Sequence, residues 1–428
     1  MKKLFTIIIS LICCINWAYA FEIDGLEYAI IDGEATVKSA ENAQREMVVV
    51  PASVTYEGET YKVTSISLGA FSGPKCHKIS SVIISEGIKY IGEEVFTSNH
   101  EIKEIIFSNS VEKIGKNACK NMLGLEKVVL PERLDTIPDG LCYANMVSSK
   151  LKEVVMPKSC KVIGKDAFMF NNQLEFLVLP DDLQEIQSGA FFECLKLQTK
   201  IPSTVKHIGG SAFENTLSPV NPVNFENIIL EPGAFQRAKG LTHLSIPEQI
   251  TNIPANCFNC CSNIETIEFT NHLDTIGQRA FNNLGKLKAI ILPSSVEYIG
   301  YGAFAKCHIL RTVYARMEYP PYLVAYEFGG EGFSSDNPSD AVVYVPVGCK
   351  GNYERAGWGK YFAQIVEMEE TEQKQEFDAI ATGISTVKAD DGVKPSGWYD
   401  LQGRRLTEPR KGVNIIRYND GTARKVLK

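Results

Sequence analysis

The chain has 428 residues, 44% of them hydrophobic and 22% charged, and a formal net charge of −7 at pH 7. The charge is uneven, since residues 384–428 carry ten basic and five acidic side chains whereas residues 21–383 carry a net charge of −14. Nucleic acid and anionic lipid would repel such an acidic body at long range, which argues against both as partners of residues 21–383.

Residues 1–20 have the features of a secretory signal peptide. Two lysines are followed by an apolar stretch (4–15) and then by the tripeptide Ala-Tyr-Ala, whose small residues suit signal peptidase. We therefore expect an exported mature chain. Lipid attachment at Cys13 or Cys14 is the alternative, but the residues before them are not the small residue that this cleavage prefers.

A repeated phrase fills the middle of the chain. SSVEYIGYGAFAKC (294–307) has counterparts in DTIGQRAFNNL (274–284), HIGGSAFENT (207–216) and VIGKDAFMFN (162–171). The isoleucine of this phrase recurs mostly every 22 or 23 residues, with one step of 26 and one gap of 45 that hides a degenerate coil. A period in the twenties is typical of leucine-rich repeats.

Each repeat predicts a coil made of two short strands and a turn. The first half alternates apolar and polar residues and ends at a proline, which interrupts a longer strand. A second extended piece carries an Ile-Gly pair, whose glycine is expected to allow a turn. The phenylalanines that close the coils should form one stacked column: Phe71, Phe96, Phe168, Phe191, Phe213, Phe258, Phe281 and Phe304. A single coil cannot offset its ordering entropy, so the coils must stack.

The repeat L-x-x-I-x-L-P-x-x-V-x-x-I-G-x-x-A-F-x-x-C resembles the BspA-like leucine-rich repeats of bacterial surface proteins. The resemblance covers about residues 63–314 and implies a β-rich solenoid of ten to eleven coils. It also implies an N-terminal β cap at 21–62, and a loop and C-terminal cap at 315–367 whose aromatic residues cover the end of the core. Around residues 217–235 the phrase is broken, which predicts a bulge or a bend.

The C-terminal region is expected to be separate from the solenoid. Residues 368–385 are acidic and rich in glutamine, and we interpret them as a linker. Residues 386–428 contain two strand-like runs and resemble the carboxy-terminal β segments of exported Bacteroidetes proteins. The resemblance implies a role in sorting or in attachment to the envelope, the only membrane contact that we expect.

Ten cysteines follow the signal peptide, and their places in the repeat indicate packing rather than a disulfide framework. Cys119 and Cys142 replace phenylalanine in adjacent coils, so they are the one pair close enough to test as a disulfide. Cys257, Cys260 and Cys261 contain a C-x-x-C without a second pair of ligands, so no metal site is expected.

No catalytic residue or cofactor site is predicted. Ser203 and Lys206 match the S-x-x-K of serine acyltransferases, but PSTVKHIG is the repeat itself and no companion motif occurs. The six histidines lack metal-binding spacing. An enzyme that acts on glycans, with carboxylates from 315–341, is the weakest alternative.

One residue of each first strand must point outward between two inward neighbours. Along the array it is Ile83, Ile106, Val129, Val155, Val178, Lys200, Ile229, Ser245, Glu268, Ile291 and Tyr314. Eight of these eleven are apolar. This follows either from the preference of branched residues for strands or from a binding stripe.

We therefore predict a secreted or surface-displayed protein that binds a protein or glycan through its sheet face. The candidate residues are Ile83, Ile106, Val129, Val155, Val178, Ile229, Ile291 and Tyr314. The resemblance implies adhesion to host proteins or to other cells. A scaffold that binds an envelope partner from the same cell is the main alternative.

Overall fold

The computed structural model describes residues 20–145, 149–219, 225–226, 228–323, 332–333, 337–382, 395–399, 405–407, 413–418 and 423–427. The chain divides into two units. Unit 1 comprises residues 1–223 and 228–240, and unit 2 comprises residues 224–227 and 241–428. The predicted signal peptide lies outside the described residues except for its last residue, and so does part of the broken stretch, residues 220–224 and 227.

Unit 1 opens with hairpins and continues as a solenoid. Strand β2 pairs antiparallel with β1 and β3, and β5 pairs antiparallel with β6. These strands are β1 (Ala20–Ile23), β2 (Leu26–Ile31), β3 (Glu34–Ser39), β5 (Ser53–Tyr56) and β6 (Glu59–Ile66). A short 3-10 helix, η1 (Pro74–Cys76), lies between β6 and the first complete coil.

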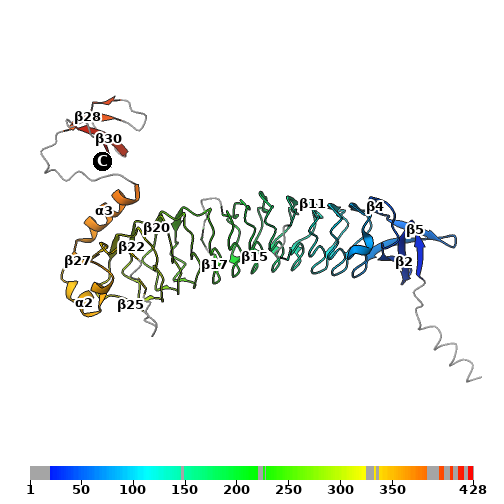
Figure 1. Ribbon diagram of the computed structural model, residues 1–428, viewed down its shortest axis with the longest axis horizontal. Helices are drawn as coiled ribbons and strands as arrows, with labels where there is room; N and C mark the ends of the chain where they lie inside the picture. Colours follow the sequence, from blue (N-terminus) through cyan, green and yellow to red (C-terminus); the bar gives the residue numbers. More distant parts are fainter. Residues whose placement is uncertain are drawn as a thin grey trace, which may run out of the picture. The chain divides into compact units, whose positions relative to one another are not determined.

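Two parallel rows of short strands run along the coils of unit 1 (Figure 1). The first-strand sheet has the order β13-β11-β9-β7-β4 and contains β4 (Met47–Val50), β7 (Ser81–Ile84), β9 (Glu104–Ile106), β11 (Lys127–Val129) and β13 (Glu153–Val155). The second row contains β8 (Tyr90–Ile91), β10 (Lys113–Ile114), β12 (Thr136–Ile137), β14 (Val162–Ile163), β15 (Glu185–Ile186), β16 (His207–Ile208) and β17 (Ile229–Leu230). The predicted solenoid is confirmed.

Unit 2 repeats the two rows. One row contains β18 (His243–Ser245), β20 (Thr266–Glu268), β22 (Ala289–Leu292), β24 (Thr312–Ala315), β26 (Val342–Val345) and β27 (Gln364–Glu367). The other contains β19 (Asn252–Ile253), β21 (Thr275–Ile276), β23 (Tyr298–Ile299) and β25 (Tyr322–Leu323). The repeat ends in α2 (Lys350–Arg355) and the 3-10 helix η2 (Trp358–Lys360).

The segment expected to be a linker, 368–385, contains the helix α3 (Glu370–Thr382). Beyond it, four short strands form an antiparallel sheet in the order β29-β28-β30-β31. They are β28 (Pro395–Tyr399), β29 (Arg405–Leu406), β30 (Val413–Tyr418) and β31 (Ala423–Leu427). Within the described parts of the chain, no helix is both long and apolar enough to cross a bilayer.

The phenylalanine column is confirmed. In unit 1, Phe168 stacks on Phe191 with ring centroids 5.6 Å apart, and Phe191 stacks on Phe213 at 5.4 Å. In unit 2, Phe281 lies 5.5 Å from Phe258 and 5.4 Å from Phe304. All eight predicted phenylalanines are fully buried. Each ring therefore packs between its neighbours, which is why the coils depend on one another.

The column also passes through the broken stretch. Phe235, which follows the irregular segment, is fully buried and stacks on Phe213 at 5.6 Å. The coil that contains Phe235 keeps its second strand, since β17 pairs in parallel with β16. The degenerate coil expected from the 45-residue gap is therefore present in unit 1.

The glycines of the Ile-Gly pairs serve close packing rather than a turn. A Cβ on Gly209 would lie 2.3 Å from the Ser188 nitrogen, and one on Gly115 would lie 2.5 Å from the Glu93 nitrogen. Neither glycine has a positive φ. Most coils have a left-handed residue on each side of the column. The one two residues before the column falls at Gly69, Glu94, Asn117, Gly140, Asp166, Gly189, Ser211, Gly233, Asn256, Arg279 and Gly302.

Cys119 and Cys142 fill the column where phenylalanine is missing. Both are buried and both are free thiols. The adjacent Cys142 thiol and burial together raise the pKa of the Cys119 thiol well above its ordinary value. The structure thus agrees with a packing role for these two cysteines.

Candidate binding surface

Five aliphatic residues face outward along the first-strand sheet of unit 1, and we call them the open stripe: Val49, Ile83, Ile106, Val129 and Val155. Each pairs in register with the next, from β4 through β7, β9 and β11 to β13. Val49 is 49% exposed and Val155 is 38% exposed, and the other three are half-buried. The sheet thus presents one aliphatic side chain per coil to solvent.

The local sequence explains this orientation. In β9 the residue before Ile106 is Ile105, which is fully buried, and the same holds for Val128 before Val129. Because side chains alternate along a strand, burial of one residue turns the next one outward. Exposed positions of a strand more often carry polar residues, but branched residues also favour strands, so the aliphatic row fits either strand preference or a binding surface.

A charged column runs beside the open stripe in β9, β11 and β13, two residues earlier in each of these strands. It contains Glu104, Lys127 and Glu153, which pair in register. The Lys127 ammonium lies 3.6 Å from the Glu104 carboxylate and 3.4 Å from the Glu153 carboxylate. The column carries a net charge of −1 and borders the aliphatic residues on one side.

The apolar surface of unit 1 extends past β13. Val178, which sequence analysis assigned to the stripe, is 86% exposed, and Phe176 is 67% exposed. Phe176 forms an isolated parallel bridge with Gln198. Lys200 is exposed at the next stripe position and ends the apolar run in this unit.

Ile229 does not belong to the stripe, contrary to the prediction. It lies in β17, where it pairs with His207 of β16, so it is part of the second row of strands. The broken phrase hid the correct phase of this coil. The spacing from Leu230 to Phe235 equals that from Ile163 to Phe168, and this marks Leu230 as the inward residue of a second strand.

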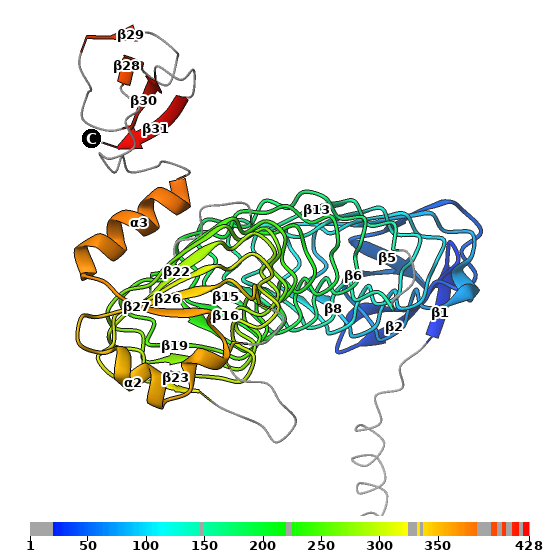
Figure 2. The same ribbon diagram turned by 60° about the vertical axis from the view of Figure 1, so that its left-hand side comes forward.

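In unit 2 the corresponding positions of β22 and β24 are covered by the chain itself, whereas Ser245 of β18 and Glu268 of β20 are exposed. Tyr314 was predicted to point into solvent, but it is fully buried, and Ile291 is only half-exposed. Phe377 of α3 lies against Tyr314 in an edge-to-face contact with ring centroids 6.5 Å apart. Tyr344 of β26 stacks on Tyr314 from the other side at 5.1 Å. Figure 2 shows α3 beside β22, β26 and β27.

Helix α3 makes polar contacts near its N-terminal end. The Glu370 carboxylate accepts an ion pair from Arg316 at 3.0 Å, and the Gln373 amide donates to the Met368 carbonyl at 3.2 Å. The Nε atom of Arg316 and the Oε1 atom of Gln373 are buried without a hydrogen-bond partner. Phe377 also packs with Tyr314 and Ala289 in one buried cluster.

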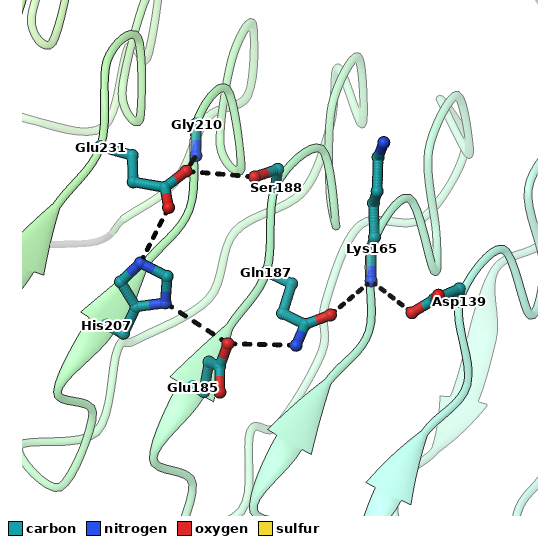
Figure 3. A network of polar contacts seen from close by, with 8 residues as sticks. All are labelled: Asp139, Lys165, Glu185, Gln187, Ser188, His207, Gly210 and Glu231. Atoms are coloured by element: carbon teal, nitrogen blue, oxygen red, sulfur yellow. Dashed lines mark hydrogen bonds and ion pairs between the residues drawn. The ribbon is translucent and has the colours of Figure 1, made fainter.

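The second row of unit 1 carries a polar network (Figure 3). His207 lies between two carboxylates, with Nε2 3.1 Å from Glu231 and Nδ1 3.4 Å from Glu185. Glu231 also accepts hydrogen bonds from the Gly210 N–H at 2.7 Å and the Ser188 hydroxyl at 3.2 Å. These donors lower the pKa of Glu231, with the Gly210 N–H contributing most.

This network lacks the geometry of a catalytic triad. The Ser188 hydroxyl donates to Glu231 rather than to His207, so the imidazole does not stand beside the hydroxyl as its base. The polar side chains instead join neighbouring coils: Glu185 belongs to β15, His207 to β16, and Glu231 directly follows β17. We interpret the network as a structural link within unit 1.

Neither the described cysteines nor the described part of the 315–341 loop provides a stronger candidate for a functional site. Burial raises the pKa values of Cys194 and Cys307 to about 12, which disfavours their reactive thiolate forms. In the described part of the chain, no group of three or more potential metal ligands comes together. The loop suggested as a source of catalytic carboxylates, 315–341, lies partly outside the described residues, at 324–331 and 334–336.

Comparison with known proteins identifies the repeat. The BspA type leucine rich repeat region family matches in six copies over residues 55–148, 141–227 and 221–317, more than half of the chain. The chain belongs to this family. No curated protein matches this BspA-type chain significantly.

Two solved structures share the fold of this BspA-type chain. A leucine-rich repeat protein from Bacteroides ovatus ATCC 8483 has a TM-score of 0.51 and 21% identity, covering 82% of this chain and 100% of its own. The pneumococcal vaccine antigen PcpA has a TM-score of 0.50 and 19% identity, covering 82% of this chain and 99% of its own. At such identities the likeness concerns the fold.

Proposed function

We propose that this BspA-type chain binds another protein through the open stripe of unit 1. The supporting observation is the contrast between the units: the stripe faces solvent in unit 1, whereas α3 covers Ile291 and Tyr314 in unit 2. A row of adjacent aliphatic side chains gains free energy when a partner removes it from water, at about 25 cal/mol per Å². Such ribbons on soluble proteins usually mark interaction sites.

The chemistry of the stripe favours a protein partner. Its five residues are aliphatic and offer no aromatic ring for a sugar to stack on, and the exposed ring beside them, Phe176, lies in the next coil. The acidic body repels nucleic acid. Protein interfaces combine an apolar centre with a charged border, and the charged column of Glu104, Lys127 and Glu153 provides one.

The proposal places this binding outside the cell, as adhesion to host proteins or to other cells. The signal-like residues 1–20 support export, and a structurally similar pneumococcal protein is described as a vaccine antigen. Residues 386–428, with their excess of basic side chains, would attach the chain to the envelope.

Capture of partners by the full mature chain tests this function. Immobilised wild-type protein and the double variant Ile106→Asp/Val155→Asp would be incubated with host extracellular extract and, separately, with extract of the producing bacterium. We expect the wild type to retain a partner from host extract that the double variant does not retain. Equal retention by both proteins would contradict binding through the stripe.

A matched control distinguishes loss of the binding surface from loss of the folded structure. Ser245→Asp adds a negative charge at an exposed position of the corresponding row in unit 2 and should leave capture unchanged. The melting temperatures of all three proteins should agree within about 2 °C, since surface substitutions are nearly neutral. Retention only of proteins from the producing bacterium would contradict host adhesion and would favour the scaffold alternative.

A further inference from the structure

We propose that the segment seated on the open stripe is an amphipathic α-helix of the partner, lying across the strands with one apolar side chain per strand. This inference rests on the proposed function, because it assumes that the stripe binds a protein. It adds the conformation and the charge pattern of the bound segment.

The chain itself shows how this sheet position is covered. In unit 2 the residues in register at the stripe position are Ile291, Tyr314 and Tyr344, on three successive strands. Helix α3 covers them by placing Phe377 against Tyr314, with Ile291 and Tyr344 packed around the pair. A helix is therefore an element that this face accepts.

The spacing of the stripe suits a helix. Neighbouring strands lie about 4.8 Å apart, whereas successive turns of an α-helix rise about 5.4 Å. One side chain per turn can thus meet one residue per coil. The five residues of the stripe span about 19 Å, and α3 has 13 residues, which at about 1.5 Å per residue extend about 20 Å.

An extended segment fits less well. Its side chains on one face recur about every 6.7 Å, so they would fall out of step with the strands after two coils. The inner strands β7, β9 and β11 are also paired on both sides. Their backbones are not free to add a strand, so a partner must use the side chains.

The charged column predicts the flank of the partner helix. Glu104, Lys127 and Glu153 alternate in sign along the direction that the helix would take. The complementary helix would carry a basic, an acidic and a basic residue on successive turns, beside its apolar row. Such pairs contribute little affinity but fix the register.

A defined peptide provides the first test. We would use a hydrocarbon-stapled 16-residue helix with leucine at one position per turn and with Lys, Glu and Lys on successive turns beside them. We expect it to bind the full chain and to lose at least tenfold in affinity against Ile106→Asp/Val155→Asp. Ser245→Asp should bind it as the wild type does. Equal binding by an unstapled peptide of the same length and charge, with a central proline that prevents a helix, would overturn the inference.

Cross-link spacing in the captured partner provides the second test. The cross-linking residue p-benzoylphenylalanine would be placed at position 83 or, in a second protein, at position 155 of the full chain. These two positions are three strands apart, about 14 Å. A helix would be cross-linked at two residues about ten apart, because it rises about 1.5 Å per residue. A separation of about four residues, or no fixed separation, would overturn the inference. Loss of stripe-dependent capture, by contrast, would overturn the proposed function itself.

Discussion

The first-strand sheets of the two units use the same repeat position in opposite ways. In unit 1 Val155 is 38% exposed at this position, whereas in unit 2 Tyr314 is fully buried. The strands are alike, and the difference comes from residues outside the repeat, because α3 follows the last strand and folds onto the sheet of unit 2. Repeat phase therefore sets the direction of a side chain, while the segments around the array decide whether it meets solvent.

The cores of the two units should respond equally to truncation, with the largest effect of any substitution. Phe191→Ala in unit 1 and Phe281→Ala in unit 2 each remove a fully buried ring from the column. We expect each to lower the free energy of unfolding by about 3–5 kcal/mol. Chemical denaturation would measure this. A much smaller cost in one unit would mean that its column is not packed as described.

The cover on unit 2 should be weaker than the core. Phe377→Ala removes the aromatic contact between α3 and Tyr314. We expect a loss of about 1.5–3 kcal/mol, the free energy of burying one phenylalanine side chain. Hydrogen exchange of the α3 amides would report its release, and unchanged exchange would show that other contacts hold the helix.

The open stripe should be the least sensitive apolar surface. Ile106→Asp/Val155→Asp places charge at positions that solvent already reaches in part, and we expect a change of no more than about 0.5 kcal/mol per substitution. Tyr314→Asp, at the corresponding covered position, should cost several-fold more because it buries a charge. Similar losses of stability at both positions, measured by denaturation, would erase the distinction between the units.

The polar network of unit 1 should contribute a smaller, pH-dependent effect. Because contacts lower the pKa of Glu231 in the folded protein, its contribution is present above the ordinary value of 4.5 and is lost as the pH falls through the folded value. Glu231→Gln should therefore flatten the decline in stability between about pH 5 and pH 3. Ser188→Ala, which removes one donor, should flatten it less. If the stability of Glu231→Gln declined with falling pH as steeply as that of the wild type, Glu231 would not be the source of this pH dependence.

Local periodicity was enough to predict the solenoid and its column, because each coil repeats the same contacts with its neighbours. The same reasoning could have found Val49, since MVVVP (47–51) has the alternation and the final proline of a first strand. It could also have phased Ile229 correctly from the spacing of Leu230 and Phe235. Both were missed because they lie where the phrase itself degenerates.

Helix α3 shows what periodicity does not supply. Residues 369–382 contain no glycine or proline and are rich in helix-forming residues, so a helix was predictable there. Its docking site was not, because the contact between Phe377 and Tyr314 joins residues far apart in sequence and depends on three-dimensional packing. The exposure of Tyr314 was mispredicted for this reason.

Protection of a cysteine at position 155 tests the central claim most directly. In a chain with Val155→Cys, Cys260→Ser and Cys349→Ser, the remaining cysteines of the described residues are buried. The rate at which maleimide labels the thiol at position 155 would be measured in the free protein and in its complex with the captured partner. We predict rapid labelling of the free protein and strong protection in the complex. Labelling that stays equally rapid while the partner remains bound would contradict the claim that the open face of unit 1 is the binding surface.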